Sequence, residues 1–140
     1  KTKRPSASLT AAAVEFAVQF LEVKEIVVMG HGLCGGCKAA LTQDLYGNEL
    51  GQGGHVAHWV DMLDEARAPI AQKLGTEGRE AELAMELEAV KVSIRNLQTF
   101  PYVADKVSNA ELSLRGAHFA ISDGILRLLD NEKDEFFAAE

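Results

Sequence analysis

The stretch that decides the fold reads Ile26-Val27-Val28-Met29-Gly30-His31-Gly32-Leu33-Cys34-Gly35-Gly36-Cys37-Lys38-Ala39-Ala40-Leu41. Its first four residues form a short apolar run, rich in β-branched side chains and ended by glycine, which predicts a strand buried on both faces. A glycine-rich turn over residues 30–36 follows directly, and a helix is expected after it. Ligands of open α/β sheets collect at the carboxyl ends of strands, so this turn is the first candidate site.

The rest of the chain predicts helices around this strand and a hairpin at the end. The expected helices cover residues 9–21, with Ser8 as N-cap, residues 55–74, with a bend or interruption at Pro69, residues 77–97 and residues 101–109. Residues 47–54 hold four glycines and predict a loop. The turn Ser122-Asp123-Gly124 predicts two closing antiparallel strands, over residues 112–121 and 125–129. The order predicts an α/β fold: a mainly parallel central sheet flanked by helices, with an antiparallel C-terminal strand pair.

Length and charge limit the classes of partner. The chain has 140 residues, enough for one compact domain, and a formal net charge of -7. An acidic surface repels nucleic acid and anionic lipid, so neither is an expected partner. The one basic cluster, Lys1, Lys3 and Arg4, is interpreted as a solvated tail. Without an apolar run of about 20 residues or a signal segment, we expect a soluble, cytoplasmic protein.

His31 and Cys34 are the candidate metal ligands. A histidine at a strand end and a cysteine three residues later, in a loop without bulky side chains, can direct a ring nitrogen and a thiolate at one point. Zinc accepts nitrogen and sulfur in a tetrahedron, and catalytic zinc sites use three protein ligands with a fourth position open. At least one further ligand is therefore required. Cys37 has three possible roles: a small buried thiol, an auxiliary ligand, or a redox partner of Cys34.

The order of these residues resembles a known family. Residues 11–18 (Ala-Ala-Ala-Val-Glu-Phe-Ala-Val) and residues 23–39 resemble the second metal-binding segment of β-class carbonic anhydrases. Residues 93–103 and 112–119, before Asp123-Gly124, are similar to the C-terminal helix pair and strand of that family. The resemblance implies that residues 1–140 form a single β-carbonic-anhydrase-like domain. It implies that His31 and Cys34 bind Zn²⁺ and that Gly35 and Gly36 shape the substrate pocket, with no ligand counterpart for Cys37.

One part of the family pattern has no match in the chain. The first ligand cysteine of the family lies in an upstream C-x-D-x-R segment, whose aspartate and arginine control the open position of the metal. Nothing in residues 1–8 matches that segment. We therefore expect the sequence to begin part way through the domain, and we assign no catalytic residue within it.

The resemblance implies zinc-dependent, reversible hydration of carbon dioxide to bicarbonate by a homodimer or tetramer, provided that the missing segment is present in the real polypeptide. The alternative is a non-catalytic, truncated member of the family that is oligomeric and binds zinc weakly or not at all. A third possibility is a thiol redox domain that uses Cys34 and Cys37. The remaining candidates receive structural roles: solvated carboxylates for Asp44 and Glu49, surface or capping roles for His55 and His58, and packing against a neighbour for His118.

Overall fold

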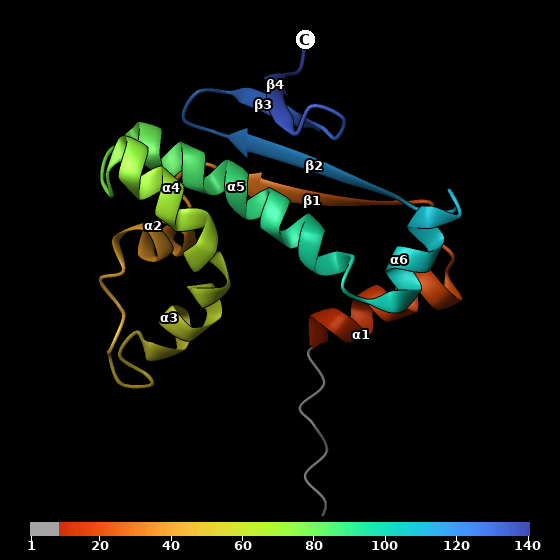
Figure 1. Ribbon diagram of the computed structural model, residues 1–140, viewed down its shortest axis with the longest axis horizontal. Coiled ribbons are helices and arrows are strands. Elements are labelled where there is room, and N and C mark those ends of the chain that lie inside the picture. Colours follow the sequence, from red (N-terminus) through yellow and green to blue (C-terminus); the bar gives the residue numbers. More distant parts are fainter. Residues whose placement is uncertain (1–8) are drawn as a thin grey trace, which may run out of the picture.

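The computed structural model describes residues 9–140 (Figure 1). The helices are α1 (Leu9–Glu15), α2 (Gly35–Thr42), α3 (Gly54–Val60), α4 (Asp64–Leu74), α5 (Arg79–Leu97) and α6 (Pro101–Ser108), with a π-helical turn η1 (Phe16–Phe20) and a 3-10 turn η2 (Asp61–Leu63). The strands are β1 (Glu25–His31), β2 (Ser113–Ala120), β3 (Ile125–Asp130) and β4 (Glu135–Ala138). The expected N-cap Ser8 and the cluster of Lys1, Lys3 and Arg4 lie outside the described residues.

The four strands form one mixed sheet in the order β1-β2-β3-β4. Strand β1 runs parallel to β2, and Gly30 and His31 lie opposite His118 and Phe119. Strand β2 pairs antiparallel with β3, and β3 pairs antiparallel with β4. The α/β class, the helices beside the sheet and the antiparallel C-terminal strands are confirmed. The expected hairpin about Asp123 is present, and the described chain closes with one strand more, β4.

Strand β1 is half-buried on one face and exposed on the other, so the expectation of burial on both faces is wrong for the described residues. Helix α5 packs against β1 and β2. On the opposite face, Val27 and Met29 remain 54% and 61% exposed. The side chains of a strand alternate between the two faces, and within residues 9–140 only one face of β1 is covered this closely.

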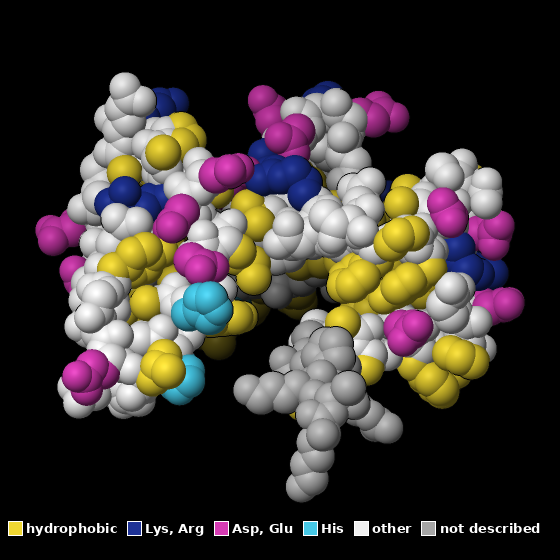
Figure 2. Space-filling model, turned by 60° about the horizontal axis from the view of Figure 1, so that its bottom comes forward, with side chains coloured by type: hydrophobic (Ala, Val, Ile, Leu, Met, Phe, Trp, Pro, Cys, Tyr) yellow, Lys and Arg dark blue, Asp and Glu magenta, His cyan; other side chains and the backbone are white. Residues whose placement is uncertain are grey.

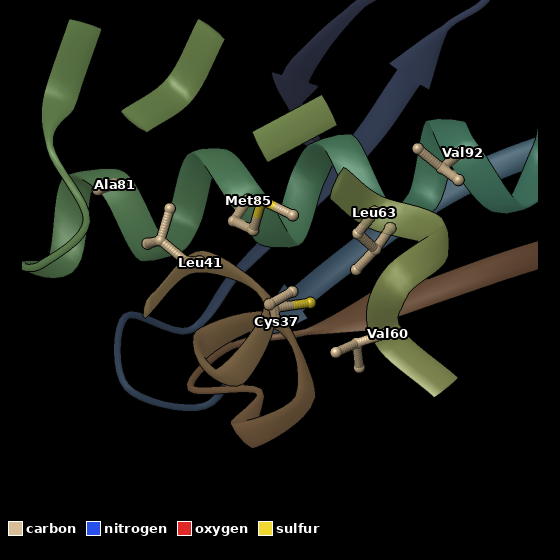
Figure 3. Close-up of a cluster of buried hydrophobic side chains, with 8 residues drawn as sticks. Cys37, Leu41, Val60, Leu63, Ala81, Met85 and Val92 are labelled. Atoms are coloured by element: carbon tan, nitrogen blue, oxygen red, sulfur yellow. The ribbon is translucent and has the colours of Figure 1, made fainter. Parts of the chain in front are cut away.

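Helix α5 separates two groups of buried side chains. One group lies between α5 and the segment from α2 to η2, as Figure 3 shows, and consists of Cys37, Ala40, Leu41, Val60, Leu63, Ala81, Met85 and Val92. The other lies toward the sheet, η1 and α6 and consists of Val18, Val90, Ile94, Val103, Leu112 and Leu114. Because α5 is packed on two sides, it is the element that fixes the sheet relative to the loop after β1.

The segment expected as one helix over residues 55–74 is divided at η2 and not at Pro69. Val60 and Leu63 are both buried, and a 3-10 turn brings side chains three residues apart onto one line, which turns both into the core. Pro69 lies inside α4, which continues to Leu74. None of the helices in residues 9–140 is long and apolar enough to cross a membrane.

Candidate metal site at the end of strand β1

The candidate site is a tight loop between the last residue of β1 and the first turn of α2. Strand β1 ends at His31, Cys34 is the N-cap of α2, and the helix begins at Gly35. The loop is tied to the next strand, because the Gly32 N–H donates to the Phe119 carbonyl at 3.0 Å. Leu33 adopts a left-handed backbone conformation with φ of 55°, which non-glycine residues rarely occupy. The surrounding contacts must therefore hold this loop in shape.

The His31 ring is oriented as zinc-binding histidines usually are. Its Nδ1–H donates to the Gly32 carbonyl at 3.0 Å, so Nε2 is the ring nitrogen that can offer its lone pair to a metal. Metal-bound histidines commonly donate their second ring nitrogen to a carbonyl or carboxylate, which fixes both the tautomer and the ring orientation. His31 therefore fits the role that the sequence predicts for it.

His31 and Cys34 line the same cavity of about 410 Å³. Gly36 also lines this cavity, whereas Gly35 is exposed at the start of α2 and is not one of the lining residues. The rest of the wall is mainly apolar and comes from β1, α3, η2 and α5: Val28, Met29, Trp59, Val60, Met62, Leu63, Ala89 and Val90. A small apolar molecule is solvated poorly in water, so its transfer into a cavity with such a wall would be favourable.

Cys37 belongs to the buried core between α2 and α5. Figure 3 shows its side chain on α2 among Met85, Leu63 and Val60. Burial, with smaller effects from the neighbouring Cys34 thiol and from Glu86, raises the pKa of Cys37 to about 12. Without a bound metal its thiol is therefore protonated at neutral pH, and a protonated thiol is a poor nucleophile. The geometry favours the core role over the ligand and redox roles.

A buried carboxylate behind the loop is the feature that the sequence analysis missed. Glu86 on α5 is 2% exposed, and Arg79 donates to it twice, from Nη1 to Oε1 at 2.8 Å and from Nη2 to Oε2 at 2.9 Å. His118 Nε2 lies 2.9 Å from Oε2, and the Cys34 N–H donates to Oε1 at 3.3 Å. Burial acts to raise the pKa of Glu86, but these hydrogen bonds outweigh it and hold the pKa below 4.5. A glutamate within the apolar pattern of residues 77–97 was the available signal.

The other titratable candidates lie away from the loop or point elsewhere. Asp44 and Glu49 are exposed, in agreement with the solvated roles expected for them. His55 and His58 are also exposed, and His58 pairs with Asp61 at 3.3 Å. His118 is fully buried and packs against Glu86, as its expected structural role requires.

The donor chemistry fits part of a zinc site. An imidazole nitrogen and a sulfur from one short loop are two of the three protein ligands that catalytic zinc uses. Among residues 9–140, no group of three or more His, Cys, Asp or Glu side chains is placed to hold a metal ion. Complete coordination therefore needs a donor beyond those that the described residues bring together.

Known proteins match this chain in sequence. The sequence profile of the carbonic anhydrase family matches residues 2–126. Mitochondrial beta carbonic anhydrase 6 of Arabidopsis thaliana is 34% identical over 122 residues, covering 81% of this chain and 39% of the relative. Beta carbonic anhydrase 3 of the same plant is 32% identical over 130 residues, covering 91% and 48%. The chain thus spans less than half the length of these two relatives.

Solved structures match the fold. The β-carbonic anhydrase CcaA superposes with a TM-score of 0.80 at 27% identity, over 92% of this chain and 57% of that one. A tetrameric β-carbonic anhydrase from the fungus Sordaria macrospora gives a TM-score of 0.72 at 29% identity, over 90% and 62%. With the family profile matched over most of the chain and the loop after β1 in place, the protein belongs to the β-class carbonic anhydrase family.

Proposed function

We propose that this protein is a zinc-dependent carbonic anhydrase, a hydro-lyase that interconverts carbon dioxide and water with bicarbonate and a proton. The observation that carries the proposal is the pairing of His31 and Cys34 at the carboxyl end of β1, beside a mainly apolar cavity. The activity requires a third ligand and an acid-arginine pair, so the proposal holds only if an upstream C-x-D-x-R segment is present in the real polypeptide.

Two residues of this chain would bind zinc, and the cavity wall would bind carbon dioxide. His31 Nε2 and Cys34 Sγ would hold the zinc ion, with the His31 ring fixed by its bond to the Gly32 carbonyl. Bound zinc would supply the Lewis acidity that makes water a nucleophile near neutral pH. The cavity wall of Val28, Trp59 and Leu63 would admit carbon dioxide and limit the number of competing waters.

The runner-up is a non-catalytic family member that binds zinc weakly or not at all. Its support is the lack of a three-donor cluster among residues 9–140. Two ligands from one loop can bind zinc only weakly, because each missing bond lowers the affinity.

The test is zinc content and carbon dioxide hydration by the full-length protein as it is encoded. We expect about one zinc per chain and rapid hydration in a stopped-flow assay, with both lost in His31→Ala and Cys34→Ser. The matched control is His58→Ala, which removes an exposed histidine that pairs with Asp61. Zinc-free wild-type protein without hydration activity would support the runner-up instead.

We also propose that the protein acts as a homodimer or tetramer, which the tetrameric state of the Sordaria macrospora relative supports. A cytoplasmic location stays a prediction, and one plant relative carries a mitochondrial name.

A further inference from the structure

The carboxylate of Glu86 is fully used by hydrogen bonds. Each of its oxygens accepts two of them: Oε1 from Arg79 and the Cys34 backbone, and Oε2 from Arg79 and His118. A carboxylate has about four acceptor positions, so no capacity remains for a substrate or a metal. Glu86 lines the candidate cavity, but only 2% of it is exposed. Glu86 must therefore act through the groups that donate hydrogen bonds to it.

One of those groups is the backbone of a proposed ligand. The Cys34 N–H donates to Glu86 Oε1, although 52 residues separate the two in the chain. This amide directly follows Leu33, whose left-handed backbone is unfavourable by itself. Because Cys34 is also the N-cap of α2, fixing its amide fixes both the start of the helix and the direction of the Cys34 side chain. The hydrogen bond thus acts where the loop is most strained.

The position of Glu86 is in turn set from two sides. Arg79 makes a two-point contact from the first residue of the same helix, and a guanidinium fixes a carboxylate in one plane. His118 approaches from β2 and is fully buried. Among residues 9–140 its Nδ1 has no hydrogen-bond partner, and because a carboxylate only accepts, the Nε2–H of His118 donates to Glu86 Oε2.

We propose that Glu86, held by Arg79 and His118, is a positioning residue for the metal site: it orients Cys34 for zinc by anchoring the Cys34 amide. This inference rests on the proposed function, because it gives Cys34 the role of a ligand. Outer residues that orient metal ligands are typically worth about 10- to 100-fold in metal affinity.

The decisive variant is Glu86→Gln in the full-length protein. Its side chain has nearly the same shape but offers one acceptor oxygen to four donors, so at least one side of the network loses its partner. We expect Zn²⁺ affinity, measured against a chromophoric chelator, to fall by about 10- to 100-fold. We also expect faster hydrogen exchange at the Cys34 amide relative to the other amides of α2. The thiolate-to-metal absorption of the Co²⁺-loaded protein should shift as the Cys34 geometry changes.

A second variant and a control keep the experiment decisive. If Glu86→Gln does not fold, Arg79→Lys keeps the positive charge on a partly exposed residue but loses the two-point contact, and a smaller loss of about three- to tenfold is expected. The control is Val103→Ala, which loosens the other buried group and leaves the loop alone, so it should lower stability with Zn²⁺ affinity within twofold of wild type. Zinc affinity within twofold in the folded Glu86 or Arg79 variant would overturn the inference.

Failure of the proposed function is distinguishable from failure of this inference. A wild-type protein that binds Zn²⁺ but hydrates no carbon dioxide would overturn the function, and the affinity ratio would still decide the role of Glu86. If the wild type bound no Zn²⁺, Cys34 would not be a ligand and both proposals would be overturned, whereas unchanged Zn²⁺ affinity in the variants of a zinc-binding wild type would overturn this inference alone.

Discussion

At Gly32 the loop passes so close to strand β2 that no side chain fits between them. A Cβ on Gly32 would lie 2.5 Å from the Cβ and 3.0 Å from the Cα of Ala120, and strand backbone cannot move aside cheaply. We expect Gly32→Ala to lower the free energy of unfolding by about 1–3 kcal/mol, through overpacking and displacement of the loop. Chemical denaturation followed by circular dichroism measures this loss.

The control for that change is Gly35→Ala, three residues later in the same segment. A Cβ there meets nothing within 4 Å, and the residue lies in the first turn of α2. Alanine restricts the unfolded chain more than glycine does, so Gly35→Ala should be neutral or stabilising by up to about 1 kcal/mol. Equal destabilisation by both variants would contradict the close approach at Gly32.

One substitution of Cys37 distinguishes its three possible roles as a core thiol, a metal ligand or a redox partner of Cys34. If it is a core thiol, Cys37→Ala removes one buried sulfur, which costs about 1 kcal/mol in the free energy of unfolding and leaves Zn²⁺ affinity unchanged. Denaturation and metal titration of the same sample test both halves of the expectation. A loss of zinc affinity of tenfold or more would identify Cys37 as a ligand, and a Cys34–Cys37 disulfide in wild-type protein under mild oxidation would favour the redox role.

The sequence indicates His31 and Cys34 as candidate ligands, but it does not indicate the buried hydrogen-bond network beside them. The two proposed ligands are three residues apart, so their joint position follows from one strand and one turn. The network of Arg79, Glu86 and His118 joins α5 to β2 and to the loop, and such pairing depends on tertiary packing that spacing does not encode. A charged residue among apolar ones in α5 signals burial with a partner, yet it does not say which partner.

At the scale of helices and strands, the sequence predicted an element correctly where its turn or cap residues are chemically specific. The hairpin turn at residues 122–124 and the proline that begins α6 are chemically specific, and both elements are confirmed. The division at η2 was missed because it depends on turning both Val60 and Leu63 into the core. Strand β4 was missed because it has four residues, too few for a clear alternation, and gains its order from pairing with β3.

The hairpin between β2 and β3 should depend on pH through Asp123. The Arg127 guanidinium donates to Asp123 Oδ2 at 2.8 Å, and the Ile125 N–H donates to Oδ1 at 2.9 Å, which together hold the pKa of Asp123 below 3.8. The folded carboxyl thus binds its proton less tightly than the unfolded one. Its contribution to stability is present above pH 3.8 and is lost as the pH falls through the folded pKa.

Asp123→Asn tests this dependence. The amide oxygen can still accept from Ile125, but the ion pair with Arg127 is lost, so the variant should be less stable than wild type at pH 7. The difference should shrink as the pH falls below 3.8, where the wild-type carboxyl takes up its proton. Paired denaturation curves across this range measure it. A difference that stays constant down to the lowest pH would show that Asp123 acts by shape and not by charge.

At the scale of the whole molecule, exposed apolar side chains gather at the end formed by α1 and α6. Figure 2 shows a group of hydrophobic side chains on the right, over this end of the molecule. Phe16 and Phe20 stack on each other with ring centroids 5.5 Å apart, yet they are 54% and 71% exposed. In the same part of the chain only Val18 is fully buried. An aromatic pair that residues 9–140 leave exposed is typical of a surface that another chain contacts.

Charge on that surface should therefore break self-association without unfolding the chain. We expect the double variant Phe16→Lys, Phe20→Lys to sediment as a smaller species than wild type at micromolar concentration, because two ammonium groups cannot be buried unpaired in an interface. The matched control is Ile121→Lys, which places the same charge on an isolated, 91% exposed apolar residue beside the hairpin turn and should leave the oligomer intact. If the wild type is already monomeric, or the control dissociates equally, the aromatic pair is not an oligomer contact. Dissociation of the double variant alone would place a subunit interface on η1, next to the strand that carries His31.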